Sequence, residues 1–161
     1  MWKTIRFEVI EVYNKRIFIF DFYHKFLVME VIWQNENFVV RKENGFHSLF
    51  SKRPFQVGEV VCEVTGEEIS FPNRYSVQVA RNLHINVKEP VKYINHHCTG
   101  NIELKEREFL AISKIEIGDE ISFNYNSTED ILAEPFNCFR CGKEIKGRVF
   151  ESEFSLSNIH N

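Results

Sequence analysis

Three short segments of this sequence carry side chains that could do chemistry. They are Tyr93–Cys98, which reads Tyr-Ile-Asn-His-His-Cys, residues 115–125, which end in Asn124-Tyr125, and Phe136–Gly142, which reads Phe-Asn-Cys-Phe-Arg-Cys-Gly. Their amide, imidazole, phenol and thiol groups can bind a polar ligand, hold a metal ion or face a reacting atom. The Cys-x-x-Cys pair in the third segment predicts metal binding or redox chemistry in a reducing compartment.

The elements that must position these side chains are mostly short β-strands. Sixteen of the 161 residues are Phe, which favours strands over helices. One or two helical turns are expected at Ser127–Ala133, with Ser127 or Thr128 as the cap, and the charged run Glu103–Glu108 reads as a solvated hairpin tip. The predicted strands are Thr4–Val12, Arg16–Phe22, Phe26–Trp33, Phe38–Val40, Glu59–Val64, Tyr75–Ala80, Leu83–Val87, Phe109–Ile115 and Glu120–Tyr125.

Length and composition predict one globular, mostly-β domain. The apolar fraction is 43% and the charged fraction 27%, which excludes wholesale disorder. Lys+Arg 20 against Asp+Glu 23 gives a net charge of −3, so no nucleic-acid or membrane-surface footprint is expected. Charged residues such as Arg6 and Glu8 interrupt any signal peptide, and no apolar run reaches the roughly 18 residues of a membrane span. We therefore expect a cytoplasmic protein.

Read together and in order, the three segments resemble the SET-domain family of protein-lysine methyltransferases. Family members carry Asn-His-Ser-Cys followed by Asn, then a Gly-Glu turn, a strand ending in Asp-Tyr, and a cysteine-bearing segment called post-SET. The resemblance extends upstream to a Phe-Ala-x-Arg-x-Ile-x-x-Gly-Glu stretch and covers about residues 37–147. The residues that carry it are Arg53, Phe55, Gly58, Glu59, Asn95, His96, Cys98, Asn101, Gly118, Glu120, Asn124, Tyr125, Cys138 and Cys141.

The resemblance implies a mostly-β, SET-domain (β-clip-like) fold of several small sheets, with knot-like C-terminal threading and few short helices. It divides the chain into an N-terminal β-rich extension (1–35), a SET domain (36–126), a degenerate post-SET-like segment (134–150) and a tail (151–161). The extension could be an extra β-layer, a dimerisation element or a substrate platform, and these alternatives stay open.

The resemblance also implies methyl transfer from S-adenosyl-L-methionine to a lysine side chain of a protein or peptide. The amine must be neutral at attack, although free Lys has a pKa of about 10.4. A narrow apolar channel beside the sulfonium lowers that pKa. Nitrogen, methyl carbon and sulfur must line up, and oxygen acceptors should surround the polarised methyl group.

Family positions assign roles to six residues. Tyr125 takes the place of the catalytic tyrosine and also faces the cofactor, while Asn95 and His96 match the cofactor-binding pair. Phe136 matches an aromatic that packs on adenine, with a core Phe as the alternative. Tyr75 and His47 are further cofactor candidates. The family's Gly-x-Gly cofactor loop is altered here, because its glycine positions hold Phe46 and Ser48.

The post-SET resemblance implies a zinc site held by Cys98, Cys138 and Cys141. Structural zinc is four-coordinate, so His97 or His160 could supply the fourth ligand. The alternative is that zinc is absent and Ile145 packs hydrophobically where a further cysteine would stand. Cys62 reads as a buried small hydrophobe.

Two other functions stay open beside an active methyltransferase. A catalytically weak or inactive SET-like protein would bind a peptide or partner, as the altered loop suggests. A zinc-knuckle protein acting on nucleic acid is suggested only by the Cys-x-x-Cys pair, and the net charge of −3 argues against it. The substrate protein, the number of methyl groups added and the oligomeric state do not follow from the sequence.

Overall fold

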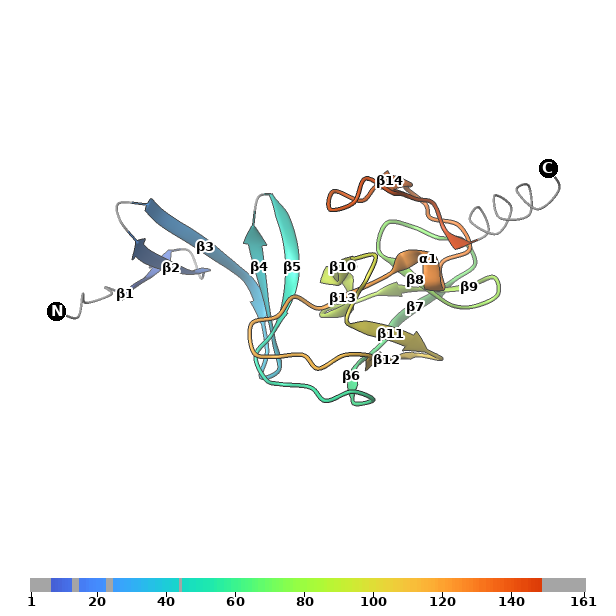
Figure 1. Cartoon of the computed structure of the whole chain (residues 1–161), viewed down its shortest axis with the longest axis horizontal. Helices are drawn as coiled ribbons and strands as arrows, with labels where there is room; N and C mark the ends of the chain where they lie inside the picture. Colours follow the sequence, from blue (N-terminus) through green and yellow to red (C-terminus); the bar gives the residue numbers. More distant parts are fainter. Residues whose placement is uncertain (1–6, 13–14, 23–24, 44, 149–161) are drawn as a thin grey trace.

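Five small β-sheets make up most of the described chain (Figure 1). The computed structural model describes residues 7–12, 15–22, 25–43 and 45–148, with the backbone alone for 7–29 and 43. Within these ranges one α-helix, α1 (Tyr125–Thr128), and one 3-10 turn, η1 (Val91–Tyr93), accompany the strands. The predicted mostly-β fold of several small sheets is confirmed. No helix in the described ranges has the length and apolar character needed to cross a membrane.

The first sheet is a five-stranded antiparallel meander, with strands in the order of the chain. In Figure 1 its first three strands extend away from the rest of the molecule, at the left. Strand β3 pairs with β4 through residues 30–34, so the N-terminal strands continue the sheet that β4 and β5 begin. The strands are β1 (Phe7–Val12), β2 (Lys15–Phe22), β3 (Lys25–Gln34), β4 (Phe38–Glu43) and β5 (Phe46–Ser51).

Two three-stranded antiparallel sheets form most of the remaining body. One has the order β11-β12-β6, from β6 (Val60–Glu63), β11 (Ile102–Lys105) and β12 (Glu108–Ala111). The turn between β11 and β12 exposes Glu106 and Arg107, as expected of a solvated hairpin tip. The other sheet has the order β7-β9-β8, from β7 (Gly66–Ile69), β8 (Ser76–Ala80) and β9 (Leu83–Val87).

Two short strands far apart in the sequence pair in parallel at the centre of the molecule. Strand β10 (Asn95–His96) lies beside β13 (Ser122–Phe123). The loop after β10 then crosses β13 closely, because a Cβ at Gly100 would lie 2.4 Å from the Ser122 carbonyl oxygen. Asn101 secures the crossing: its amide donates to the Glu120 carbonyl (2.8 Å), and its side-chain oxygen accepts the Ser122 N–H (3.0 Å).

The apolar core fills the space between these sheets. Segment 115–121 pairs with β5 through the Phe50–Glu120 bridge and with the loop after β5 through the Phe55–Ile115 bridge. The largest side chains below 2% exposure are Phe55, Phe109, Leu49, Ile85, Ile115, Ile121 and Ile145. Strands β14 (Phe136–Asn137) and β15 (Glu144–Ile145) form a small C-terminal hairpin that buries Ile145.

The structure corrects the predicted helix. Helical turns were expected at Ser127–Ala133, whereas α1 begins at Tyr125 and ends at Thr128. Asn124 caps it, because its side-chain oxygen accepts the Asn126 N–H. The predicted strands Phe109–Ile115 and Glu120–Tyr125 are also too long, since the pairing residues are those of β12 and β13. The proposed boundaries at 36, 126, 134 and 150 stay predictions, and the tail 151–161 lies outside the described residues.

Candidate functional site

The parallel pair β10–β13 places Tyr125 against the Asn-His segment. Residue Phe123 pairs with His96, and the chain turns into α1 two residues later. The Tyr125 backbone N–H donates to His96 Nδ1 (3.3 Å), and the Tyr125 hydroxyl donates to the Ile94 carbonyl oxygen (2.9 Å). The phenol therefore lies along the backbone that leads into β10.

An aromatic cluster surrounds Tyr125. Its ring lies 5.3 Å from the His96 ring and 4.8 Å from the Phe123 ring, centre to centre. Phe136 closes the cluster from the C-terminal hairpin, 5.6 Å from His96 and 6.1 Å from Tyr125, both edge to face. Phe136 is 38% exposed, so it borders solvent rather than filling the core.

Asn95 joins β10 to β5. Its side-chain amide donates to the His47 carbonyl oxygen (2.9 Å) and to Ser48 Oγ (2.8 Å). The His47 ring stacks edge to face on Tyr93 at 6.0 Å. The segment that matches the family's cofactor loop thus contacts β10, since buried Ser48 accepts a hydrogen bond from the Asn95 amide. These contacts place the loop at Phe46–Ser48 beside the β10–β13 pair.

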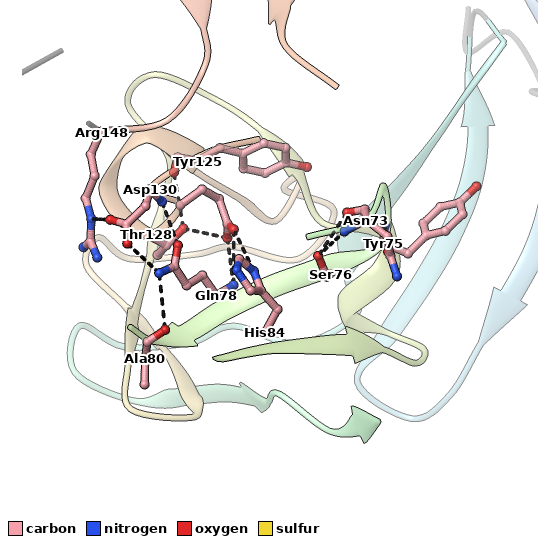
Figure 2. Close-up of polar contacts among 11 residues, drawn as sticks. Asn73, Tyr75, Ser76, Gln78, Ala80, His84, Tyr125, Thr128, Asp130 and Arg148 are labelled. Carbon is pink, nitrogen blue, oxygen red and sulfur yellow. Dashed lines mark hydrogen bonds and ion pairs between the residues drawn. The ribbon is translucent and has the colours of Figure 1, made fainter. Parts of the chain in front are cut away.

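Tyr75 stands apart from the other sequence-predicted residues. It precedes β8, and its N–H donates to Asn73 Oδ1 (2.7 Å). Its side chain is 51% exposed and points away from Tyr125, as Figure 2 shows. The other candidates, His47, Asn95, His96, Tyr125, Phe136 and the three cysteines, form one connected network of contacts. The cofactor role of Tyr75 stays a prediction without a contact to that network among the described residues.

Burial keeps both central side chains neutral near pH 7. It raises the pKa of the Tyr125 phenol well above its ordinary value, and the Glu129 and Glu120 carboxylates add to this rise. Burial also lowers the pKa of His96 to about 4, with the nearby charges of His97 and Lys143 acting in the same direction. Tyr125 therefore stays a protonated hydroxyl donor, and His96 stays an uncharged imidazole.

Three of the four cysteines gather next to this cluster. The donor atoms of His96, Cys98 and Cys138 lie within 4.8 Å of one another, and Cys141 Sγ lies 3.4 Å from Cys98 Sγ. Hydrogen bonds from the backbone at Cys141 and Arg140 hold the pKa of Cys138 below its ordinary value, while burial raises that of Cys98 to about 12. Thiols and an imidazole at this spacing fit the donor set of a tetrahedral zinc site.

The structure separates the alternatives for the zinc site. His97 turns away, since its Nδ1 accepts the Thr99 N–H (3.1 Å), and His160 lies outside the described residues. Ile145 is completely buried, as the alternative without zinc supposes, yet the three cysteines still converge. Cys62 is partly buried against the core, and burial raises the pKa of its thiol to about 12, which fits its prediction as a small hydrophobe.

A surface hollow of about 250 Å³ is lined in part by Glu120. The Glu120 carboxylate also contacts the side-chain amide of Asn95. Arg140 reaches across the hollow to Glu120 (3.4 Å). Tyr125 does not line this hollow. Its walls are His97, Thr99, Asn101, Asp119, Glu120, Ser122 and Arg140.

Sequence reasoning missed a buried polar network that fixes α1 (Figure 2). The Glu129 carboxylate accepts the Gln78 N–H (3.0 Å) and lies 3.8 Å from His84 Nδ1. The Gln78 side chain both donates to Asp130 Oδ2 and accepts the Asp130 N–H, each at 2.7 Å. Burial raises the pKa of Glu129 to about 7. No sequence signal could reveal this network, because Gln78 and Glu129 are 51 positions apart and the alternation of the strand places Gln78 on the face opposite Val77 and Val79, although it is buried.

Comparison with known proteins supports this description. No family model matches the chain. It is 37% identical over 73 residues to a protein named methyltransferase flvH from Aspergillus flavus, and the match covers 43% of this chain and 40% of the relative.

Solved structures of polycomb repressive complex 2 share the fold. A humanized mutant of the Chaetomium thermophilum complex bound to an inhibitor gives a TM-score of 0.50 at 21% identity, over 71% of this chain and 19% of that one. The same complex bound to S-adenosylmethionine gives 0.50 at 21%, over 70% and 20%. These likenesses show the SET-domain fold. The chain therefore has the SET-domain fold that its motifs predict, and it spans less than half of the relatives it matches.

Proposed function

We propose that the protein transfers a methyl group from S-adenosyl-L-methionine to a lysine side chain of a protein or peptide. The SET-domain fold supports this proposal, as does the local sequence relationship to a protein named as a methyltransferase. One structure with the same fold has S-adenosylmethionine bound. The observation that carries the proposal is the ring contact of Tyr125 with His96, next to Asn95 on β10.

The Tyr125 hydroxyl serves the reaction as an oxygen acceptor. Its proton is engaged by the Ile94 carbonyl, so the lone pairs of the oxygen are free to face a polarised methyl group. Because burial raises the pKa of the phenol, Tyr125 does not take a proton from the incoming ammonium at neutral pH. The lysine must therefore lose its proton before attack, and the catalytic contribution of the site is positioning.

We expect the cofactor to bind to the residues around β10. The sulfonium of S-adenosylmethionine would supply the electrophilic methyl group. The backbone around Asn95 and His47 offers polar groups at one end of the site, and Phe136 offers a half-exposed ring at the other. Aromatic rings bind flat heterocycles through stacking and buried area, so Phe136 is our candidate for the adenine contact.

Replacing Tyr125 with Phe tests the mechanism. Tyr125→Phe should lower methyl transfer by about 100-fold, the usual effect of removing one polar group aimed at a transition state. Cofactor affinity should change by less than about threefold, because the ring and its contacts remain. Methylation is measured with heavy-methyl cofactor and mass spectrometry of a treated proteome lysate, and cofactor affinity by calorimetry. Phe71→Leu, at a residue 82% exposed, is the control. Undiminished turnover in Tyr125→Phe would reject the mechanism.

A SET-like module without catalysis is the second candidate. It is favoured by the cofactor loop, where Phe46 and Ser48 replace the family's glycines and Phe46 is 71% exposed. Calorimetry with S-adenosylmethionine separates the two functions. Measurable binding supports the methyltransferase, and the absence of binding supports the module.

A further inference from the structure

We propose that the metal centre of this protein is a site of three cysteine thiolates and one histidine, with His96 as its fourth ligand, and that metal binding there releases the Tyr125 backbone N–H from His96. The first part stands on the ligand geometry alone. The second part concerns a residue whose catalytic role rests on the function proposed above.

The four proposed ligand atoms form one connected cluster. His96 Nε2 lies 3.3 Å from Cys98 Sγ, and Cys98 Sγ lies 3.4 Å from Cys141 Sγ. Cys138 Sγ is within 4.8 Å of both His96 and Cys98. Zinc bonds of about 2.0–2.3 Å place neighbouring ligands of a tetrahedron about 3.5–3.8 Å apart. Cys141 Sγ does not belong to the group of donor atoms within 4.8 Å of one another, so its side chain must turn toward that group to complete the site.

His96 is suited to this role and His97 is not. The His96 ring is held by Tyr125 and Phe136 and is only 8% exposed, so its Nε2 has a fixed direction toward Cys98. His97 directs its Nδ1 to the N–H of Thr99, in the same loop, and lines the hollow beside Glu120. The chain thus compensates for the missing post-SET cysteine with a histidine from its own Asn-His motif.

Once a metal is bound to His96 Nε2, His96 Nδ1 cannot go on accepting the Tyr125 N–H. A neutral imidazole carries one proton. While Nδ1 accepts the Tyr125 N–H, that proton sits on Nε2 and points at Cys98. Metal binding at Nε2 sends this proton to solvent, and Nδ1 takes up another. Nδ1–H then faces the Tyr125 N–H, donor against donor, so this hydrogen bond breaks and the start of α1 must shift.

Cobalt titration tests the ligand set on the full chain. Co(II) should bind one equivalent and show the strong visible bands and thiolate charge-transfer bands of a tetrahedral site with three thiolates and one imidazole. His96→Ala should weaken Co(II) binding by about 100-fold and change the band pattern. His97→Ala, one residue away, is the matched control and should bind as the wild type does. Wild-type binding by His96→Ala, or no Co(II) binding by the wild type, overturns the proposal.

Nitrogen NMR of the wild-type protein tests the coupling without any variant. Zn(II) should move the ¹⁵N resonance of His96 Nε2 from a protonated to a metal-bound position, give a protonated Nδ1, and shift the Tyr125 amide resonance. An unmoved Nε2 resonance at full zinc occupancy refutes the His96 assignment. A moved Nε2 with an unchanged Tyr125 amide refutes the coupling. Neither readout needs methyl transfer, so failure of the proposed function is seen separately.

Discussion

At the scale of single residues, the site depends on two residues, Gly100 and Asn101, that allow and hold a crossing of the chain. The Asn101 side chain hydrogen-bonds to the Glu120 carbonyl and to the Ser122 N–H at the start of β13. Gly100 lets the loop after β10 lie directly on the Ser122 and Phe123 backbone. Both residues follow the Asn-His segment within a few positions, so the crossing fixes where β10 lies. The close approach of two backbones is a requirement that only glycine meets.

Gly100→Ala should therefore destabilise the protein by about 3 kcal/mol, the upper range for a single substitution that forces a steric clash. The added Cβ would meet the Ser122 oxygen at 2.4 Å and the Phe123 Cα at 2.5 Å. Gly118→Ala is the comparison, because nothing lies within 4 Å of its Cβ and only its φ of +90° opposes the change, at about 1 kcal/mol. Urea denaturation measures both. Equal losses would show that the crossing tolerates a side chain.

The sequence could predict the residue types of the site but not the direction of each side chain. Asn95, His96, Tyr125 and Phe136 come together as their motif positions suggest. The choice between His96 and His97 as the histidine facing the cysteines could not be predicted, since both lie in one dipeptide. It depends on Thr99, which binds His97, and on the rings that hold His96.

At the scale of elements, the one-turn helix α1 depends on tertiary contacts rather than on its own sequence. Four residues are too few for a stable isolated helix. The Glu129 and Gln78 contacts fasten its C-terminal end to β8, and Asn126 accepts the Gly147 N–H at 3.0 Å. This explains why the cap residues Ser127 and Thr128 misplaced the element: its position is set by β8 and the C-terminal segment.

Glu129→Gln should remove a pH dependence of folding stability. The pKa of Glu129 is about 7 in the folded protein against an ordinary value of 4.5, so the folded state holds a proton that the unfolded state has lost. The free energy of unfolding therefore falls as the pH rises from about 4.5 to about 7, and is flat above. Relative to the wild type, the variant should gain on the order of 2 kcal/mol between pH 5 and pH 8.

The amide of Gln can keep the geometry at this position. Its oxygen can accept the Gln78 N–H, and its nitrogen can donate to His84 Nδ1, which is buried and lacks a hydrogen-bond partner in the described part of the chain. Stability is measured by urea denaturation at several pH values. Glu134→Gln, at an exposed residue near Arg74, is the control and should leave the pH profile unchanged. An unchanged profile in Glu129→Gln contradicts the assignment.

At the scale of the whole molecule, the N-terminal strands and the SET-domain body share one sheet. The predicted boundary at residue 35 falls in the turn between β3 and β4, where the sequence has the polar residues Asn35, Glu36 and Asn37. Composition cannot show that β3 pairs with β4 or that Ile32 and Trp33 pack against the core. Those facts come from long-range packing, and we predict from them that the SET-domain body extends toward the N-terminus to about residue 30.

Two truncations distinguish these boundaries. A chain of residues 30–161 keeps the pairing of Glu30–Gln34 with β4 and the packing of Ile32 and Trp33, so it should unfold cooperatively with stability close to that of the full chain. A chain of residues 36–161 loses both side chains, at a cost of about 3 kcal/mol, and leaves β4 as an unprotected edge that favours aggregation. Thermal unfolding followed by circular dichroism, with light scattering, compares them. Equal behaviour of the two chains would place the boundary at 36, and loss of cooperativity in both would make the N-terminal strands part of the folding unit.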